Sequence, residues 1–252
     1  VHWVSSHPTL QQANTGYVGS FGVVKLINNA IIENARTGIS NTLKKPNGDI
    51  VNKLNGGIIL AEDATFRNCK KAIEFLKFPL GYSGTSDYTS LFESCTFETT
   101  DTLVDGTTYP ETFVSLWDVK GVAFTSCDFI NSNPSQFLDQ YRGTGIYSID
   151  AEYTVESECL AFGPGGCTEY DTTTFTNLLR GVEAHGTYGT GIVVKNAKFD
   201  HTHRGVLIDG LAYADIISNN FELANFDGSN LLSGYTDGFA VHSNGSSGFN
   251  IW

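Results

Sequence analysis

The chain has 252 residues and a formal net charge of −12, and charged residues make up only 17% of it. This acidic balance excludes nucleic acid as a partner, because nucleic-acid-binding surfaces are basic, and it argues against docking on anionic lipid. No apolar run approaches the roughly 18 residues of a membrane-spanning helix, so we expect no membrane span. The 27 glycines and the 40% of hydrophobic residues predict a β-rich, turn-rich chain with a continuous core.

An internal repeat runs along the chain. A large apolar residue, here called the anchor, is followed six positions later by Gly or Ala and then by Ile or Val. The full pattern begins at Ile32, Phe66, Phe175 and Phe199, and Phe97, Phe129 and Phe221 extend the series of anchors. Such a repeat predicts a solenoid, in which each unit buries its apolar side only against its neighbours.

A polar position follows two residues after the anchor. It is occupied by Asn34, Asn68, Asn131 and Asn177, and His201 holds the equivalent place. Stacked coils place equivalent side chains about 4.8 Å apart. We therefore predict a ladder in which each Asn amide bonds its neighbours above and below, next to turn backbone that would otherwise be unpaired.

Seven segments with alternating apolar residues follow the Gly or Ala position. They cover residues 38–42, 72–76, 113–117, 145–149, 181–185, 205–209 and 238–242. Their second and fourth residues, such as Ile73 and Phe75 or Phe239 and Val241, are expected to face the core, and the third and fifth to face outward. A β-sandwich would show hairpin turns every 8–12 residues, roughly, and leaves the repeat unexplained. A leucine-rich repeat would show LxxLxLxxN, which is absent.

These patterns predict an all-β fold, a right-handed parallel β-helix of about seven coils with loop insertions. We expect one domain over residues 1–252, belonging to a longer chain, because the last residues read as the middle of a coil. The insertions are predicted at residues 76–95, 99–112, 131–143, 157–172 and 224–236.

The five cysteines fall into two groups. Cys159 and Cys167 bracket a short loop rich in Gly and Pro, which favours a local disulfide. Cys69, Cys95 and Cys127 lie in apolar strand contexts and are predicted to be buried free thiols. No CxxC pair exists, so a structural zinc site is not expected.

The outward positions of the predicted strands offer candidate ligand-binding residues. Trp117, Tyr147 and Glu183 should lie on neighbouring coils along one face, with Asp209 one coil beyond Glu183. Trp and Tyr rings can stack on sugars, and carboxylates accept hydrogen bonds from sugar hydroxyls. This predicts a glycan-binding face, against the simpler interpretation of a mixed solvent-exposed face without a ligand.

The same face also offers candidate catalytic and metal-binding residues. Glu183 and Asp209 could act as acid and base, because glycosidase carboxylates lie about 5–9 Å apart, and His185 and Tyr147 could serve as base and acid in β-elimination. His185, Asp209 and His242 are expected to form a column, and the two histidines are candidate metal ligands.

No cofactor is expected to be required, and calcium (Ca2+) is kept as an alternative although no DxDxDG loop occurs. The DHTHR run is predicted to be a turn in preference to a metal site, although its two histidines are spaced to share one face of a strand.

The runs GGIILAEDATFRNCKKAIEF and FVSLWDVKGVAFTSCDFINS, followed by GTGIYSIDA and the Cys-containing loop, resemble β-helix regions of large secreted proteins of Bacteroidota. The resemblance covers roughly residues 22–221. It implies export by the type IX secretion machinery, a secreted or cell-surface location, and a polysaccharide or cell-surface glycan as partner. The wider superfamily resembles pectate lyases, polygalacturonases and adhesins. The NTD, DD and GHG motifs of polygalacturonases and the RxxR arrangement of pectate lyases are absent, so no catalytic residue is transferred.

We therefore expect a non-catalytic, adhesin-like β-helix protein that displays a glycan- or partner-binding face. The alternatives are a polysaccharide lyase or glycoside hydrolase, and a structural spacer.

Overall fold

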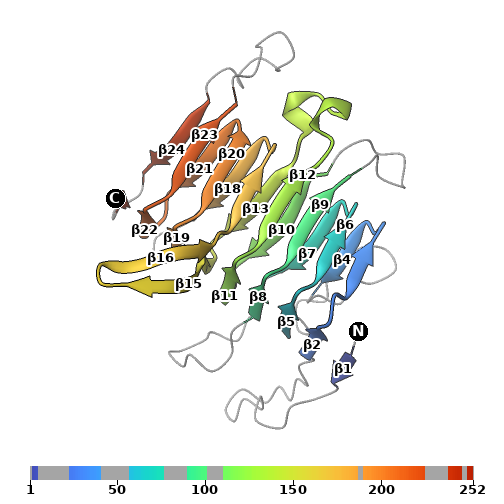
Figure 1. Ribbon diagram of the computed structural model, residues 1–252. Coiled ribbons are helices and arrows are strands. Elements are labelled where there is room, and N and C mark those ends of the chain that lie inside the picture. Colours follow the sequence, from blue (N-terminus) through green and yellow to red (C-terminus); the bar gives the residue numbers. More distant parts are fainter. Residues whose placement is uncertain are drawn as a thin grey trace, which may run out of the picture.

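The computed structural model describes residues 2–4, 23–40, 57–76, 90–100, 110–186, 190–224, 238–245 and 249–251. In this part of the chain, three parallel sheets wind around one core as a right-handed parallel β-helix (Figure 1), as predicted from the repeat. None of the helical segments described has the length and apolar character that crossing a membrane requires.

Each coil passes through sheets A, B and C in turn. Sheet A contains β1 (His2–Val4), β2 (Val23–Leu26), β5 (Ile58–Glu62), β8 (Ser90–Glu93), β11 (Lys120–Thr125), β14 (Glu152–Glu156), β19 (Gly191–Lys195), β22 (Tyr213–Ile217) and β25 (Phe249–Ile251). Sheet B contains β3 (Ile31–Glu33), β6 (Thr65–Arg67), β9 (Thr96–Thr99), β12 (Asp128–Asn131), β17 (Thr174–Thr176), β20 (Lys198–Thr202) and β23 (Asn220–Leu223). Sheet C contains β4 (Thr37–Ser40), β7 (Lys71–Phe75), β10 (Thr112–Trp117), β13 (Thr144–Ile149), β18 (Arg180–His185), β21 (Arg204–Asp209) and β24 (Phe239–Asn244). Within these sheets only β1 pairs antiparallel, with β2.

A ladder of phenylalanine rings fills the core beneath sheet B, and it confirms the predicted anchors. It consists of Phe66, Phe97, Phe129, Phe175, Phe199 and Phe221. Successive ring centroids are 4.7–4.8 Å apart and the rings lie within 12° of parallel. This distance is the spacing of neighbouring strands, so each ring is stacked simply because its strand is in register.

The ladder also explains the Gly of the repeat. A Cβ atom added to Gly181 would lie 2.4 Å from the ring of Phe199, and one added to Gly205 would lie 2.6 Å from the ring of Phe221. A side chain at either glycine would therefore displace the anchor of the next coil, whereas earlier coils accommodate Ala72 and Phe113 at the equivalent position. The Gly that follows an anchor by six residues thus contacts the anchor of the next coil.

Most corners between sheets are formed by one residue in the left-handed region. At the corner between sheets A and B, Asp63, Ser94, Ser126, Asn196 and Ser218 have φ values of 49–55°. At the corner between sheets B and C, Asn34, Asn68 and Asn177 have φ values of 52–59°, and His201, near the end of β20, has a φ value of 51°. Asn and Asp tolerate this region better than most residues.

Backbone bonds between coils stabilise most of these corners, because the corner amide donates to a carbonyl of the next coil. The N–H of Asn34 donates to Arg67 over 3.0 Å, and that of Asn177 donates to Asp200 over 2.9 Å.

The predicted amide-to-amide ladder is wrong at two of its members. Asn131 lies within β12, and its side chain bonds the carbonyl of Arg142 and the amide of Asn133. The Asn177 side chain donates to the backbone carbonyl of Asn131. The repeated residue therefore follows mainly from the backbone conformation that the corner needs.

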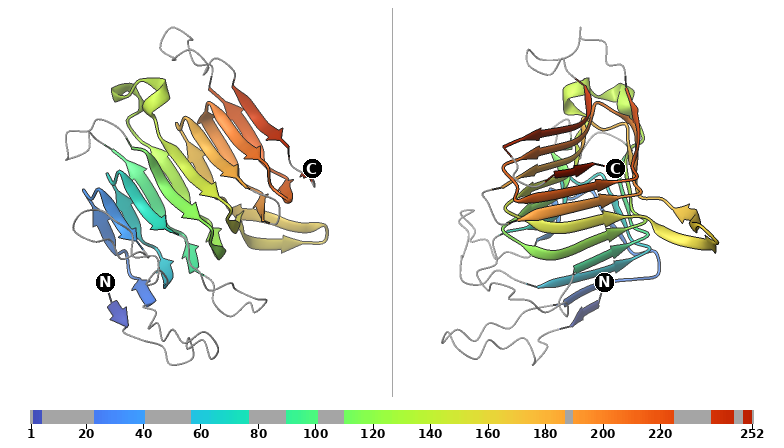
Figure 2. Two further views of the ribbon diagram at one scale, coloured as in Figure 1. Left: turned by 180° about the vertical axis from the view of Figure 1, so that it is seen from behind. Right: turned by 90° about the vertical axis from the view of Figure 1, so that its left-hand side faces the viewer.

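The cysteines behave as predicted. A disulfide joins Cys159 and Cys167 across a hairpin of β15 (Glu158–Gly163) and β16 (Gly166–Asp171), which stands out from the stack of coils (Figure 2). Cys69, Cys95 and Cys127 are buried and free.

The insertions are confirmed in part. The hairpin occupies residues 157–172, and residues 131–143 contain the short turns η2 (Pro134–Gln136) and η3 (Asp139–Tyr141). The insertion predicted at 76–95 is too long, because β8 places Phe92 in the core, stacked on Phe124 with centroids 4.9 Å apart. Most of the insertions predicted at 99–112 and 224–236 lies outside the described residues.

Candidate functional site: a groove on sheet C

Outward side chains of sheet C form three rows that cross the strands. The edge row contains Lys71, Thr112, Thr144, Arg180, Arg204 and Phe239. The middle row contains Ser40, Glu74, Ser115, Tyr147, Glu183, Leu207 and His242. The third row contains Trp117, Ile149, His185, Asp209 and Asn244. Side chains in one row are one strand spacing apart, about 4.8 Å.

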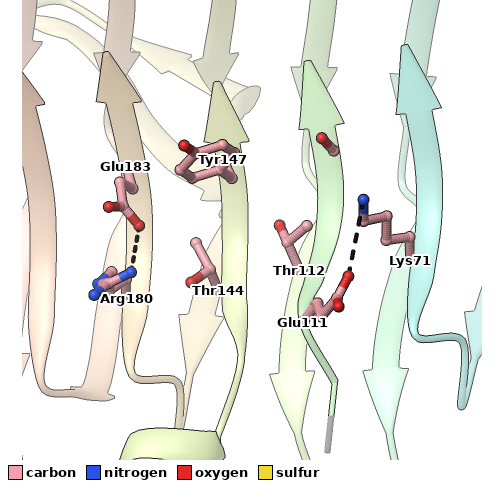
Figure 3. Close-up of a pocket in the computed structure, with 8 residues that line it drawn as sticks. Lys71, Glu111, Thr112, Thr144, Tyr147, Arg180 and Glu183 are labelled. Carbon is pink, nitrogen blue, oxygen red and sulfur yellow. Dashed lines mark hydrogen bonds and ion pairs between the residues drawn. The ribbon is translucent and has the colours of Figure 1, made fainter. Parts of the chain in front are cut away.

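A pocket of about 260 Å³ opens on this face and is here called the C-face groove (Figure 3). It is lined by Lys71, Glu111, Thr112, Ser115, Thr144, Tyr147, Arg180 and Glu183. Its floor is made by the short hydroxyl side chains of β10 and β13, and the longer charged side chains of β7 and β18 stand at its two ends. The hollow therefore results from short residues between long ones on an otherwise regular sheet.

An ion pair stands at each end of the groove. At one end the Lys71 Nζ atom lies 3.4 Å from Glu74 and 3.8 Å from Glu111. At the other, the Arg180 guanidinium lies 2.6 Å from Glu183. Glu74 and Glu183 face outward, yet they are only 5% and 6% exposed. Carboxylates so far removed from water require cationic or hydrogen-bonding partners, which these contacts supply.

Tyr147 forms a wall of the groove beside Glu183. Burial raises the pKa of the Tyr147 phenol, the negative charge of Glu183 raises it further, and Arg180 opposes this shift. The phenol therefore stays protonated at neutral pH, and its hydroxyl can donate a hydrogen bond to a ligand.

Glu183, His185 and Asp209 meet beside the groove. His185 Nε2 lies 3.1 Å from Glu183 Oε1, and His185 Nδ1 lies 3.3 Å from Asp209 Oδ2. Asn244 donates to the other oxygen of Asp209 over 3.1 Å. A neutral imidazole can donate to one of these carboxylates and a protonated imidazole to both.

This arrangement changes the interpretation of the two carboxylates. Glu183 and Asp209 lie in different rows. Glu183 is opposite Leu207 in the middle row, whereas Asp209 is opposite His185 in the third row. The imidazole stands between them, where a glycosidic bond would have to lie in a glycoside hydrolase.

The predicted position of His242 is wrong. His242 lies opposite Leu207, and Asn244 takes the place beside Asp209. Phe239 lies opposite Arg204 in the edge row, with the guanidinium 5.1 Å from its ring centroid, and does not join the core. A shift of two residues leaves Val241 facing inward and His242 facing outward, so the alternation of these residues alone could not detect it.

Trp117 and Tyr147 both face outward, but they are not in one row. Tyr147 lies directly opposite Ser115 and Glu183, whereas Trp117 lies opposite Ile149 and is 41% exposed. Trp117 therefore does not line the C-face groove, although its ring remains accessible on the same sheet.

The cluster of metal-type ligands found among the described residues lies on sheet B. Its members are Asp200, His201 and Glu222, whose ligand atoms lie within 4.8 Å of one another. The Lys198 ammonium is 2.9 Å from Asp200, and this hydrogen bond lowers the pKa of the Asp200 carboxyl. A cation of the chain itself thus already faces this cluster. The shifted register separates His242 from His185 and Asp209, so the predicted column does not form.

Sequence reasoning missed five groove residues, namely Lys71, Glu111, Thr112, Thr144 and Arg180. All of them except Glu111 stand just before a predicted segment, because β7, β10, β13 and β18 begin one residue earlier than expected. Aligning the repeats on the residue before the Gly or Ala position would have revealed this polar row.

No protein-family model matches the chain, and comparisons with curated sequences and with solved structures found no significant match either. The fold is therefore established by the geometry of the chain itself, and the groove has to be interpreted from its own residues.

Proposed function

We propose that this chain belongs to a secreted or cell-surface protein that binds a glycan in the C-face groove without cleaving it. The observation that carries the proposal is the composition of the groove. Hydroxyl groups line its floor, ion pairs offering both donors and acceptors stand at its ends, and an accessible Tyr147 ring forms a wall. Sugar hydroxyls both donate and accept, so they can bond to each of these groups.

The dimensions support a short saccharide as the ligand. The groove reaches from β7 to β18, which is three strand spacings or about 14 Å. Its volume of about 260 Å³ is close to the lower end of the range of roughly 300–1,000 Å³ for small-molecule sites. A longer glycan would continue over the same face, where Trp117 offers a second ring.

The resemblance to β-helix regions of Bacteroidota proteins, within a pectate-lyase-like superfamily, supports a secreted location and export by the type IX machinery. The non-catalytic reading is supported by the contacts of Glu183 with Arg180 and His185.

A lyase or hydrolase is the second candidate, favoured by the cluster of Glu183, His185 and Asp209. A depolymerisation screen that follows reducing ends and ultraviolet absorbance of unsaturated products, with and without calcium, separates the two. Cleavage that Glu183→Ala or His185→Ala abolishes would establish the enzyme.

Calorimetric titration with oligosaccharides of defined sequence tests glycan binding. Ser115→Trp fills the floor of the groove and should weaken binding by about tenfold or more. Thr154→Trp places the same side chain on the outward face of sheet A and should leave affinity unchanged. Equal affinities of both variants and the parent chain would show that the groove is not the binding site.

A further inference from the structure

The charges of the C-face groove define which saccharides it can take. Two cations, Lys71 and Arg180, face three carboxylates at its ends, namely Glu74, Glu111 and Glu183. Glu111 also lies 3.2 Å from Lys70. Both groove cations are thus already engaged, and the described wall carries at least as much negative as positive charge.

An acidic sugar would bring a further negative charge next to these carboxylates. A uronate or sulfate group that approaches Arg180 also approaches Glu183, and one that approaches Lys71 also approaches Glu74 and Glu111. Glu74 and Glu183 are 5% and 6% exposed, so water screens the repulsion between either carboxylate and an anionic ligand only weakly. Displacing one of these carboxylates from its cation would instead weaken the pairing of a buried charge, which costs more than one new surface contact returns.

A neutral sugar avoids this repulsion. One hydroxyl can accept from Lys71 while donating to Glu111, and another can accept from Arg180 while donating to Glu183, with both ion pairs intact. The hydroxyl of Thr112 donates to the carbonyl of Val114 over 2.9 Å, so its oxygen is oriented as an acceptor for the ligand. The net charge of −12 adds long-range repulsion against polyanions at low salt.

We propose that the C-face groove is a site for uncharged saccharides and that its carboxylates exclude uronic-acid and sulfated glycans. This inference rests on the proposed glycan-binding function and specifies its ligand class. Glu74, Glu111 and Glu183 are then specificity-determining residues, which act by rejecting the wrong ligand as well as by bonding the right one.

The test measures affinities for matched neutral and acidic oligosaccharides. The probes are neutral gluco-, xylo-, manno- and galacto-oligosaccharides, together with oligogalacturonate and its fully methyl-esterified form, which shares its rings and lacks its charge. The parent chain should bind at least one neutral probe, and it should bind the ester about tenfold more tightly than the acid. Calcium should not reverse this order.

Charge-neutralising variants provide the second arm. Glu111→Gln and Glu183→Gln should each raise the affinity for oligogalacturonate several-fold, because they release Lys71 or Arg180 from a carboxylate. Glu98→Gln is the matched control, because it removes the same charge from an ion pair with Arg67 on sheet B. Glu111 is partly exposed, so its replacement carries little risk to folding even if Glu183→Gln is unstable.

The outcomes separate the two proposals. Tighter binding of oligogalacturonate than of its ester, or equal effects of the three Gln variants, would overturn the selectivity and leave glycan binding in place. Binding of no probe by the parent chain would overturn both.

Discussion

Carboxylates on the outer faces of the solenoid meet contrasting environments within one sheet. On sheet B, the hydrogen bond from Lys198 lowers the pKa of Asp200. Two coils earlier, burial raises the pKa of Asp128, while a hydrogen bond from the Thr174 hydroxyl opposes the shift and the charge of Asp171 adds to it. Both residues face outward on the same sheet. Whether a cation lies next to the carboxylate therefore matters more for its effect on stability than its position on the strand.

The raised pKa of Asp128 predicts how the stability of the chain depends on pH. Its pKa is raised in the folded state, so its contribution to stability is present at low pH and is lost as the pH rises through the folded pKa. Asp128→Asn keeps an acceptor for Thr174 and removes the charge. The variant should therefore be more stable than the parent chain at neutral pH, by on the order of 0.5 kcal/mol.

Urea unfolding at two pH values checks this expectation. The difference in unfolding free energy between the variant and the parent chain should disappear below about pH 3.9, where free Asp is itself protonated. Asp200→Asn is the contrasting variant and should destabilise the chain at neutral pH. A pH-independent difference at Asp128 would contradict the assignment of the effect to charge.

At the scale of the element, the phenylalanine ladder ties each strand of sheet B to the next. Phe129 is fully buried between two parallel neighbours, whereas Phe221 is partly buried and stacks on Phe199. Large-to-small changes cost the transfer of the lost atoms and also the cavity that they leave. The same substitution should therefore have a different effect along the ladder.

Phe129→Ala should lower the free energy of unfolding by about 3–5 kcal/mol, and Phe221→Ala by roughly half as much. Chemical denaturation with matched variants measures both values. Equal losses at the two positions would mean that stacking on both sides adds nothing beyond burial, and that the ladder is only a consequence of the register.

At the scale of the whole molecule, the hairpin of β15 and β16 replaces a single corner residue. In the following coil, Asn196 alone connects β19 to Ala197 and β20. In the hairpin coil, hydroxyl groups satisfy the backbone instead, because Ser157 donates to the carbonyl of Asn196 over 2.6 Å and the amide of Thr173 donates to Ser157 over 2.9 Å. Coils with very different lengths therefore remain in register.

Replacing residues 157–172 by one Asn should give a folded chain with an unchanged β-helix. The disulfide is lost together with the loop that it closes, so its loss should not lower the stability of the β-helix. The same deletion with Ala at the corner is the control, and it should be less stable by about 1–2 kcal/mol because of its left-handed conformation. Circular dichroism and urea unfolding distinguish the two variants, and aggregation of the Asn variant would contradict the equivalence of hairpin and corner.

Each pattern in the sequence encodes a different property of the fold, and this decides which features could be predicted. Phe and Gly positions report contacts between coils, so the anchors and the core were predictable. Alternation reports only which face a residue occupies, so it placed Tyr147 and Glu183 outside correctly but could not detect the two-residue shift of β24. The groove itself depends on which outward residues are short, and no periodic pattern marks Thr112, Ser115 and Thr144 as the floor of a pocket.

The corners have a consequence for how such a chain can change under selection. Because one left-handed residue is enough to turn the chain, and a long hairpin does the same task without altering the stacked strands, insertions at a corner are nearly neutral for the core. The stacked strands and the loops at the corners can then evolve separately. New surfaces can arise beside the C-face groove by growth of a corner, with no compensating substitution among the phenylalanines that hold the coils together.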